Sequence, residues 1–171
     1  MRSITRVSLV IAASAALVGS LALPASAADT VATVTVPVGL LTISAPASAN
    51  LGAVAPGSPV AAALGTVTVS DLRAGVQDWD AQVNMSDFVG ANTSTVIPAA
   101  SATYTPTAAV ESGTSTVTPS AQMGLDAAKT VQSATAVSGN NTAEWTADLS
   151  FTAPANALAD TYTATLTHSV L

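Results

Sequence analysis

The sequence predicts an all-β fold, built as a single antiparallel β-sandwich-like domain. Apolar and polar residues alternate with a period of two in several short segments, the pattern of half-buried strands. Ten glycines and nine prolines among 171 residues supply turns between these segments. One short helical turn is predicted, at residues 122–129.

The expected strands begin with residues 33–38, where Val34, Val36 and Val38 share one face, followed by an apolar strand at 40–43. The two clearest alternations, 78–86 and 144–151, each carry a tryptophan on the apolar face. The other strands are expected at residues 65–72, 102–105, 115–118, 131–137 and 162–171.

Residues 1–27 have the features of a secretory signal peptide. Arg2 and Arg6 supply positive charge, residues 7–23 are apolar, and Ala25-Ser26-Ala27 offers the small residues of a cleavage site. We therefore expect a secreted β-domain of residues 28–171. No later apolar run has the length of a membrane span, so no membrane insertion is expected.

The charge of the secreted part restricts its partners. Removal of the signal peptide leaves Arg73 and Lys129 against ten Asp and Glu, a formal net charge of 2 − 10 = −8. Such a surface repels nucleic acid and anionic lipid, whereas a neutral glycan or a cationic partner stays compatible with it.

The chemistry of an enzyme is not indicated. The chain has no cysteine, which excludes thiol catalysis and cysteine-ligated metals. Signatures of an activated nucleophile, a phosphate-binding loop or a zinc site are also missing. We expect neither catalysis nor a cofactor or bound metal.

Three segments occur in an order that resembles a known family. Asp71-Leu72-Arg73 ends a Thr-rich strand and is followed by Trp79, then by Ser86-Asp87-Phe88, and the third segment is Tyr162-Thr163-Ala164-Thr165-Leu166-Thr167. This order resembles the WxL domain of Gram-positive surface proteins over about residues 40–171. The two Trp-x-Leu triplets of that family are altered, because Asp80-Ala81 follows Trp79 and His168-Ser169-Val170 occupies the second place.

The resemblance implies non-covalent binding to the peptidoglycan of the cell wall. It also implies that five residues belong to the structural motif of the fold: Asp71, Arg73, Phe88, Tyr162 and His168. Since Asp71 and Arg73 are two residues apart, they are expected to pair on one strand face or to hold the following loop.

Trp79 and Trp145 each have two interpretations. Their apolar strand neighbours predict core packing, where an aromatic ring is strongly stabilising. As exposed rings they would instead contact wall glycan by stacking on sugars. Asp78 and Asp80 are candidate ligand contacts beside Trp79, and a calcium ion could bridge them, although solvated surface is the expected role.

His168 is the single histidine and shares a strand face with Leu166 and Val170. Partial burial and a hydrogen-bonded packing role are therefore expected rather than ligand binding.

The function predicted from these observations is that of a secreted protein associated with the cell wall, which binds peptidoglycan or an associated glycan through polar strand faces. Three alternatives stay open. The chain could be a structural subunit that assembles with itself or with other surface proteins through strand edges. It could be a secreted carbohydrate-binding adhesin, or a calcium-stabilised surface domain.

Overall fold

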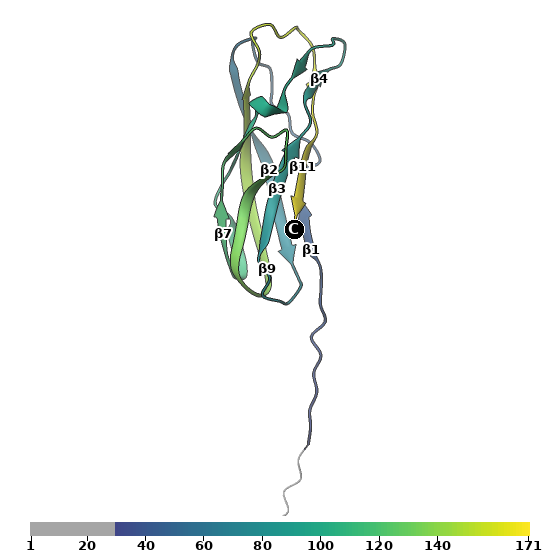
Figure 1. The fold of residues 1–171 in the computed structure, drawn as a ribbon, viewed down its shortest axis with the longest axis vertical. Helices are drawn as coiled ribbons and strands as arrows, with labels where there is room; N and C mark the ends of the chain where they lie inside the picture. The colour runs from purple at the N-terminus through teal and green to yellow at the C-terminus, as the bar shows by residue number, and fades with distance from the viewer. Residues whose placement is uncertain (1–29) are drawn as a thin grey trace, which may run out of the picture. The chain divides into compact units, whose positions relative to one another are not determined.

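One long strand, β9 (Lys129–Thr152), pairs with four other strands and organises the domain. The structure, a computed structural model, describes residues 30–171 (Figure 1). The predicted signal peptide, residues 1–27, lies outside these described residues. Between residues 30 and 171, no helix is long and apolar enough to cross a membrane.

All strand pairs of the described chain are antiparallel, as predicted, and they form two sheets. The eight-stranded sheet contains β9 together with β1 (Leu41–Ser44), β2 (Pro59–Asp71), β3 (Trp79–Met85), β6 (Thr103–Pro106), β7 (Val110–Pro119), β8 (Gln122–Met123) and β11 (Leu166–Val170). The three-stranded sheet contains β4 (Phe88–Gly90), β5 (Val96–Ile97) and β10 (Tyr162–Thr163).

The large sheet folds over on itself into two layers. The second half of β9 pairs with β2 and β6, and β2 also pairs with β1; we call these strands the β2 layer. The first half of β9 pairs with β3 and the end of β7, and β3 also pairs with β11; these form the β3 layer. Since β1 lies next to β11 on the side away from β9, the sheet nearly closes (Figure 1).

The passage of β9 from one layer to the other requires an unusual backbone. Between Ala134, opposite β3, and Asn141, opposite β2, two residues have positive φ: Ala136 at 54° and Gly139 at 72°. The neighbouring strand β7 shifts register at the same level through Gly113 (φ 86°), where a Cβ atom would collide with the Asn140 carbonyl. Glycine adopts this conformation without strain, whereas alanine is strained in it because of its Cβ atom.

Two apolar clusters fill the space between the layers of residues 35–171, which form one compact unit. One cluster surrounds Trp79 and Trp145, and the other surrounds Phe88, Tyr104 and Phe151. The alternation of the sequence is seen directly in β3 and in the second half of β9, where the apolar residues of 79–85 and 143–151 are buried. Two polar residues of β9, Gln132 and Asn141, are buried as well.

Most expected strands are present, but three expectations about secondary structure were wrong. Residues 122–129 contain β8, a turn and the start of β9 instead of a helical turn. The one short helix of residues 30–171 is a 3-10 turn at Ala99–Ser101. The expected strand 162–171 is interrupted at Ala164 and Thr165, because β10 pairs with β4 and β11 with β3.

The third error is the strand at residues 33–38, which is not formed. The last backbone hydrogen bonds before β1 join Gly39 and Leu40 to Leu72, where β2 has already ended. No strand therefore continues alongside this segment, and Pro37 has no N–H to donate.

Replacing Ala136 by glycine should stabilise the fold. Relief of the left-handed strain, about 1–2 kcal/mol, exceeds the added entropy of the unfolded chain, about 0.4–1 kcal/mol. We expect Ala136→Gly to raise the free energy of unfolding by roughly 0.5–1 kcal/mol in urea titrations. Ala61→Gly, at an exposed position of β2, is the matched control and should lower it. An equal loss of unfolding free energy in both variants would contradict the strain assigned to the backbone of Ala136.

Candidate functional site

The two tryptophans lie inside the core. Trp79 and Trp145 are each 2 % exposed, in strands β3 and β9. The core-packing interpretation is therefore correct, and the interpretation of these rings as direct glycan contacts is wrong, since neither presents a face to solvent.

Asp71 and Arg73 form the predicted pair at the end of β2. The guanidinium donates from Nε to Asp71 Oδ1 and from Nη2 to Oδ2, both at 2.9 Å, and Nη2 also donates to the Gln77 carbonyl at 3.0 Å. Asn141 donates to Asp71 Oδ2 at 3.4 Å and accepts from Trp79 Nε1 at 3.2 Å. This network holds the loop between β2 and β3, so its role is structural.

The guanidinium of Arg73 holds the pKa of Asp71 below its ordinary value, because its hydrogen bonds stabilise the carboxylate. Asp71 is only 2 % exposed, and a buried charge of this kind requires such a partner.

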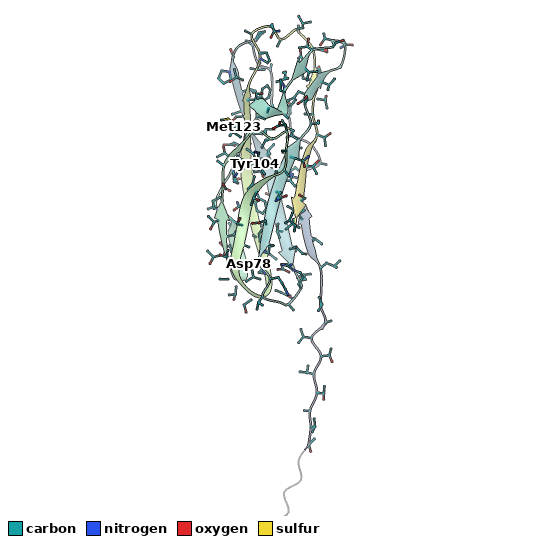
Figure 2. The ribbon with its side chains drawn as sticks, in the orientation of Figure 1. Asp78, Tyr104 and Met123 are labelled. Atoms are coloured by element: carbon teal, nitrogen blue, oxygen red, sulfur yellow. The ribbon has the colours of Figure 1, made fainter. Side chains whose placement is uncertain are left out.

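The structure places Asp78 and Asp80 in different settings. Asp78 is exposed at the lower end of the domain in Figure 2, toward the opposite end from Met123. Asp80 is half-buried and accepts a hydrogen bond from Ser133 Oγ at 2.6 Å. Within residues 30–171, no group of three or more His, Cys, Asp or Glu side chains gathers at distances suited to a metal ion.

A chain of three polar side chains crosses the core between the two layers. Trp145 Nε1 donates to the hydroxyl of Tyr104 at 3.2 Å, and that hydroxyl lies 3.3 Å from His168 Nε2. The Tyr104 and His168 rings also meet edge to face, with centroids 5.7 Å apart. Because the tyrosine proton is not used toward Trp145, it can be donated to a neutral imidazole.

Burial keeps this chain uncharged. It raises the pKa of the Tyr104 hydroxyl and lowers the pKa of His168, since the charged forms lose hydration. His168 thus has the hydrogen-bonded packing role that its strand face predicted. Its partner Tyr104 was missed, because the register of β6 against β9 brings Tyr104 to Trp145 and the packing of the two layers brings His168 to Tyr104.

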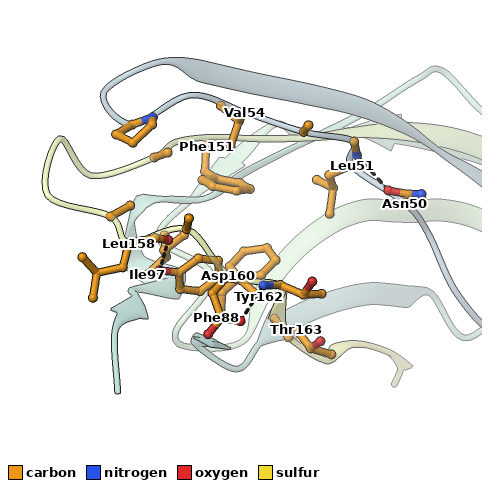
Figure 3. Close-up of a pocket in the computed structure, with 18 of the residues that line it drawn as sticks. Asn50, Leu51, Val54, Phe88, Ile97, Phe151, Leu158, Asp160, Tyr162 and Thr163 are labelled. Atoms are coloured by element: carbon orange, nitrogen blue, oxygen red, sulfur yellow. Dashed lines mark hydrogen bonds between the residues drawn. The ribbon is translucent and has the colours of Figure 1, made fainter. Parts of the chain in front are cut away.

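The motif residues Phe88 and Tyr162 line a cleft of about 840 Å³ at the end of the domain where β10, β4 and β5 lie. Phe88, Ile97 and Phe151 form its apolar floor, with the Phe88 and Phe151 ring centroids 4.8 Å apart (Figure 3). The loop that carries Leu51 and Val54 forms one wall, as Figure 3 shows.

Asp160 fixes the opposite wall of this cleft. Its carboxylate accepts hydrogen bonds from the backbone N–H groups of Asn92, Thr93 and Thr161, each at 2.8 Å, and from the Asn92 side chain at 3.0 Å. These donors, the Asn92 backbone first, lower the pKa of Asp160 well below its ordinary value. The cleft is therefore bordered by a loop that is tied to the turn after β4.

The outer surface of the β2 layer is a regular polar feature of the domain. Directly paired residues share a face of a sheet, so the strand registers define rows of side chains. We call this surface the hydroxyl face: Thr42, Ser44, Ala61, Ala63, Thr68, Ser70, Thr103, Thr105, Val110, Ser112, Thr142, Glu144, Thr146, Asp148 and Ser150. None of these residues is buried.

The rows of the hydroxyl face run across strands. One row is Ala63, Asp148 and Thr105, and the row nearest the β7 bend is Thr42, Ser70, Thr142 and Ser112. Neighbouring rows are separated by two residues along each strand, roughly 6.6–6.8 Å, and neighbouring strands by roughly 4.8 Å. The result is an ordered array in which ten of the fifteen residues have short hydroxyl side chains, with two carboxylates and no cation.

At its upper end this face leads into a shallow hollow of about 430 Å³. The row of Ala61, Ser150 and Thr103 lines the hollow, and the exposed side chain of Met123 lies at its rim. A flat polar surface is thereby joined to a site that can receive a projecting group.

Sequence reasoning expected polar strand faces but not this site. Alternation identified the outward residues of β2 and β9 separately, whereas the rows depend on which strands lie side by side. None of the candidate ligand contacts Trp79, Asp78, Asp80 and Trp145 belongs to the hydroxyl face.

Comparisons of the chain with protein-family models, with curated proteins and with solved structures found no match. The resemblance to the WxL domain therefore rests on the motif residues alone.

Removal of the Tyr104 hydroxyl should be costly. Tyr104→Phe leaves the N–H of Trp145 and the imidazole of His168 without their partner in the core, a loss of about 1–3 kcal/mol. Tyr162→Phe is the matched control, because its hydroxyl donates to the Leu158 carbonyl in an exposed setting. Urea titrations should show a clearly smaller loss for Tyr162→Phe, and equal losses would contradict the buried chain.

Stability should fall as the pH drops through the ordinary pKa of histidine. The folded pKa of His168 is lowered, so below about pH 6.5 the unfolded chain binds a proton that the native state resists. The loss is at most about 1.4 kcal/mol per pH unit. Asp71 and Asp160, whose folded pKa values are lowered, lose their stabilising effect only near and below about pH 4.

Urea titrations between pH 7.5 and 5 isolate this effect, because His168 is the single histidine of the chain. His168→Gln should flatten the dependence in this range. If the free energy of unfolding depends on pH as strongly in His168→Gln as in the wild type, the dependence belongs to other groups.

Proposed function

We propose that the chain is a secreted cell-surface protein that attaches non-covalently to a glycan of the cell wall through the hydroxyl face. The observation that carries the proposal is the array of short hydroxyl side chains in register across the β2 layer. The secretory features of residues 1–27 and the resemblance to the WxL domain support export and a wall location.

The chemistry of the face suits a polymer rich in hydroxyl groups. Serine and threonine hydroxyls both donate and accept hydrogen bonds. Their short side chains lose little conformational freedom on binding, and the strands already fix their positions. Many weak contacts along an extended chain then add up to useful affinity.

Charge and shape restrict the polymer further. Glu144 and Asp148 are the two charged residues of the face, so a polyanion is disfavoured and a neutral or partly cationic glycan is favoured. The hollow beside Met123 offers room for a side group of such a polymer. Peptidoglycan or an associated wall glycan is the partner we infer.

The alternatives differ in what supports them. The adhesin alternative requires exposed tryptophan rings on which sugars can stack, but both rings are buried. A calcium-stabilised domain has no carboxylate group of three in residues 30–171 to hold the ion. A self-assembling structural subunit is favoured by one specific observation, the exposed valines that precede β1.

Co-sedimentation with isolated cell-wall sacculi tests the proposal. The secreted form, residues 28–171, should pellet saturably. A variant with Thr68→Val, Thr105→Val and Thr146→Val loses three hydroxyls but no apolar contact and should bind at least about tenfold more weakly, since each hydrogen bond contributes about 0.5–1.5 kcal/mol.

The control carries Thr116→Val, Thr118→Val and Thr167→Val, at exposed positions of the β3 layer, and should pellet like the wild type. The proposal fails if the wild type does not pellet above background. It also fails if both triple variants, each shown to be folded by circular dichroism, bind equally well.

A further inference from the structure

The segment before β1 exposes an unusual amount of apolar surface. Residues 33–40, which we call the valine arm, place Val34, Val36, Val38 and Leu40 at alternate positions. Val36, Val38 and Leu40 are 71 %, 80 % and 73 % exposed, and the arm pairs with no strand of the described chain. Branched residues in strict alternation are typical of a strand that is covered on one face.

The arm cannot cover this face by extending β1. In β1 the odd-numbered residues Leu41 and Ile43 point toward the core, whereas the apolar residues of the arm are even-numbered. Since side chains alternate along a strand, a continued β1 would turn the valines toward solvent. Because the phase changes between Leu40 and Leu41, the valines need a different surface to cover them.

The cleft lined by Tyr162 has the properties of that surface. Residues 161–165 are bonded along one edge, where Ala91 donates to the Thr161 carbonyl at 2.9 Å and Ser86 to the Thr165 carbonyl at 3.0 Å. Their other edge pairs with no strand in residues 30–171, and β10 is the end strand of its sheet. Beside this open edge lies the apolar floor of the cleft.

The arm cannot place its valines in the cleft of its own domain. It joins the domain beside Leu72, at the end of β2, whereas the cleft includes Pro56, just before the start of β2. The 13 residues of β2 span roughly 40 Å between these points. Residues 33–40 span at most about 28 Å even when fully extended. A valine arm that enters this cleft must therefore belong to a second copy.

We propose that the valine arm of one copy adds as a strand to the open edge of residues 161–165 in a second copy and buries its valines in that cleft. Backbone hydrogen bonds would supply affinity, and alternate side chains would enter the apolar floor. The arm and the cleft lie on different surfaces of one copy, so two antiparallel copies that exchange arms would close as a dimer, and one-way addition would extend into chains. This assembly is separate from glycan binding, because it leaves the hydroxyl face free.

Sedimentation velocity of the secreted form, residues 28–171, over a range of concentrations tests this assembly without any glycan present. The wild type should self-associate, into a dimer if the exchange of arms is mutual and into a series of oligomers if it is not. Val36→Asp makes the valine arm unfit for an apolar cleft. Ala53→Trp, at an exposed residue that lines the cleft, blocks the cleft itself. Each variant alone should weaken self-association at least about tenfold, whereas Val76→Asp, at an equally exposed valine between β2 and β3, should not.

The decisive sample is the mixture of the two defective variants. The Ala53→Trp chain keeps an intact arm and the Val36→Asp chain an intact cleft, so equal amounts should form a one-to-one dimer and nothing larger. Ala159→Trp, at another exposed position in the cleft, replaces Ala53→Trp if the latter is not folded by circular dichroism. A monomeric wild type at all concentrations, or a mixture of folded variants that stays monomeric, would overturn the proposal.

Discussion

The hydrogen bonds along β9 are the constraint on which the other parts of the domain depend. A single strand of 24 residues supplies a pairing edge to both layers, so the position of each layer follows from the bend between Ala134 and Asn141. That bend brings Trp145 of one layer over Trp79 of the other within one apolar cluster. The left-handed residues at the bend are thus the local cost of a core shared by two layers.

The same arrangement decides where function can lie. The large aromatic side chains are used between the layers, and the polar chain from Trp145 through Tyr104 to His168 is satisfied internally and uncharged. The surfaces that a partner can reach include the row-ordered polar face on the β2 layer and the apolar cleft with its open strand edge. A polymer and a protein strand are the kinds of partner that these two surfaces suit.

The sequence was sufficient for the properties that depend on a single strand. Alternation predicted the burial of Trp79 and Trp145, the half-burial of His168 and the all-β class. It failed where the outcome depends on neighbouring strands. The valines of residues 33–38 have the pattern of a strand but no partner beyond Leu72. The rows of the hydroxyl face likewise require the register of β2, β9 and β6, which periodicity does not contain.

The most direct test of the central claim, that the hydroxyl face is the binding surface, is a titration of ¹⁵N-labelled residues 28–171 with soluble glycan fragments released from cell walls. The amide shifts of Thr105, Thr146, Asp148 and their row neighbours should change together, while those of β3 and β11 stay in place. Shifts concentrated in the β3 layer or around the cleft, or no shifts at saturating glycan, would contradict the account.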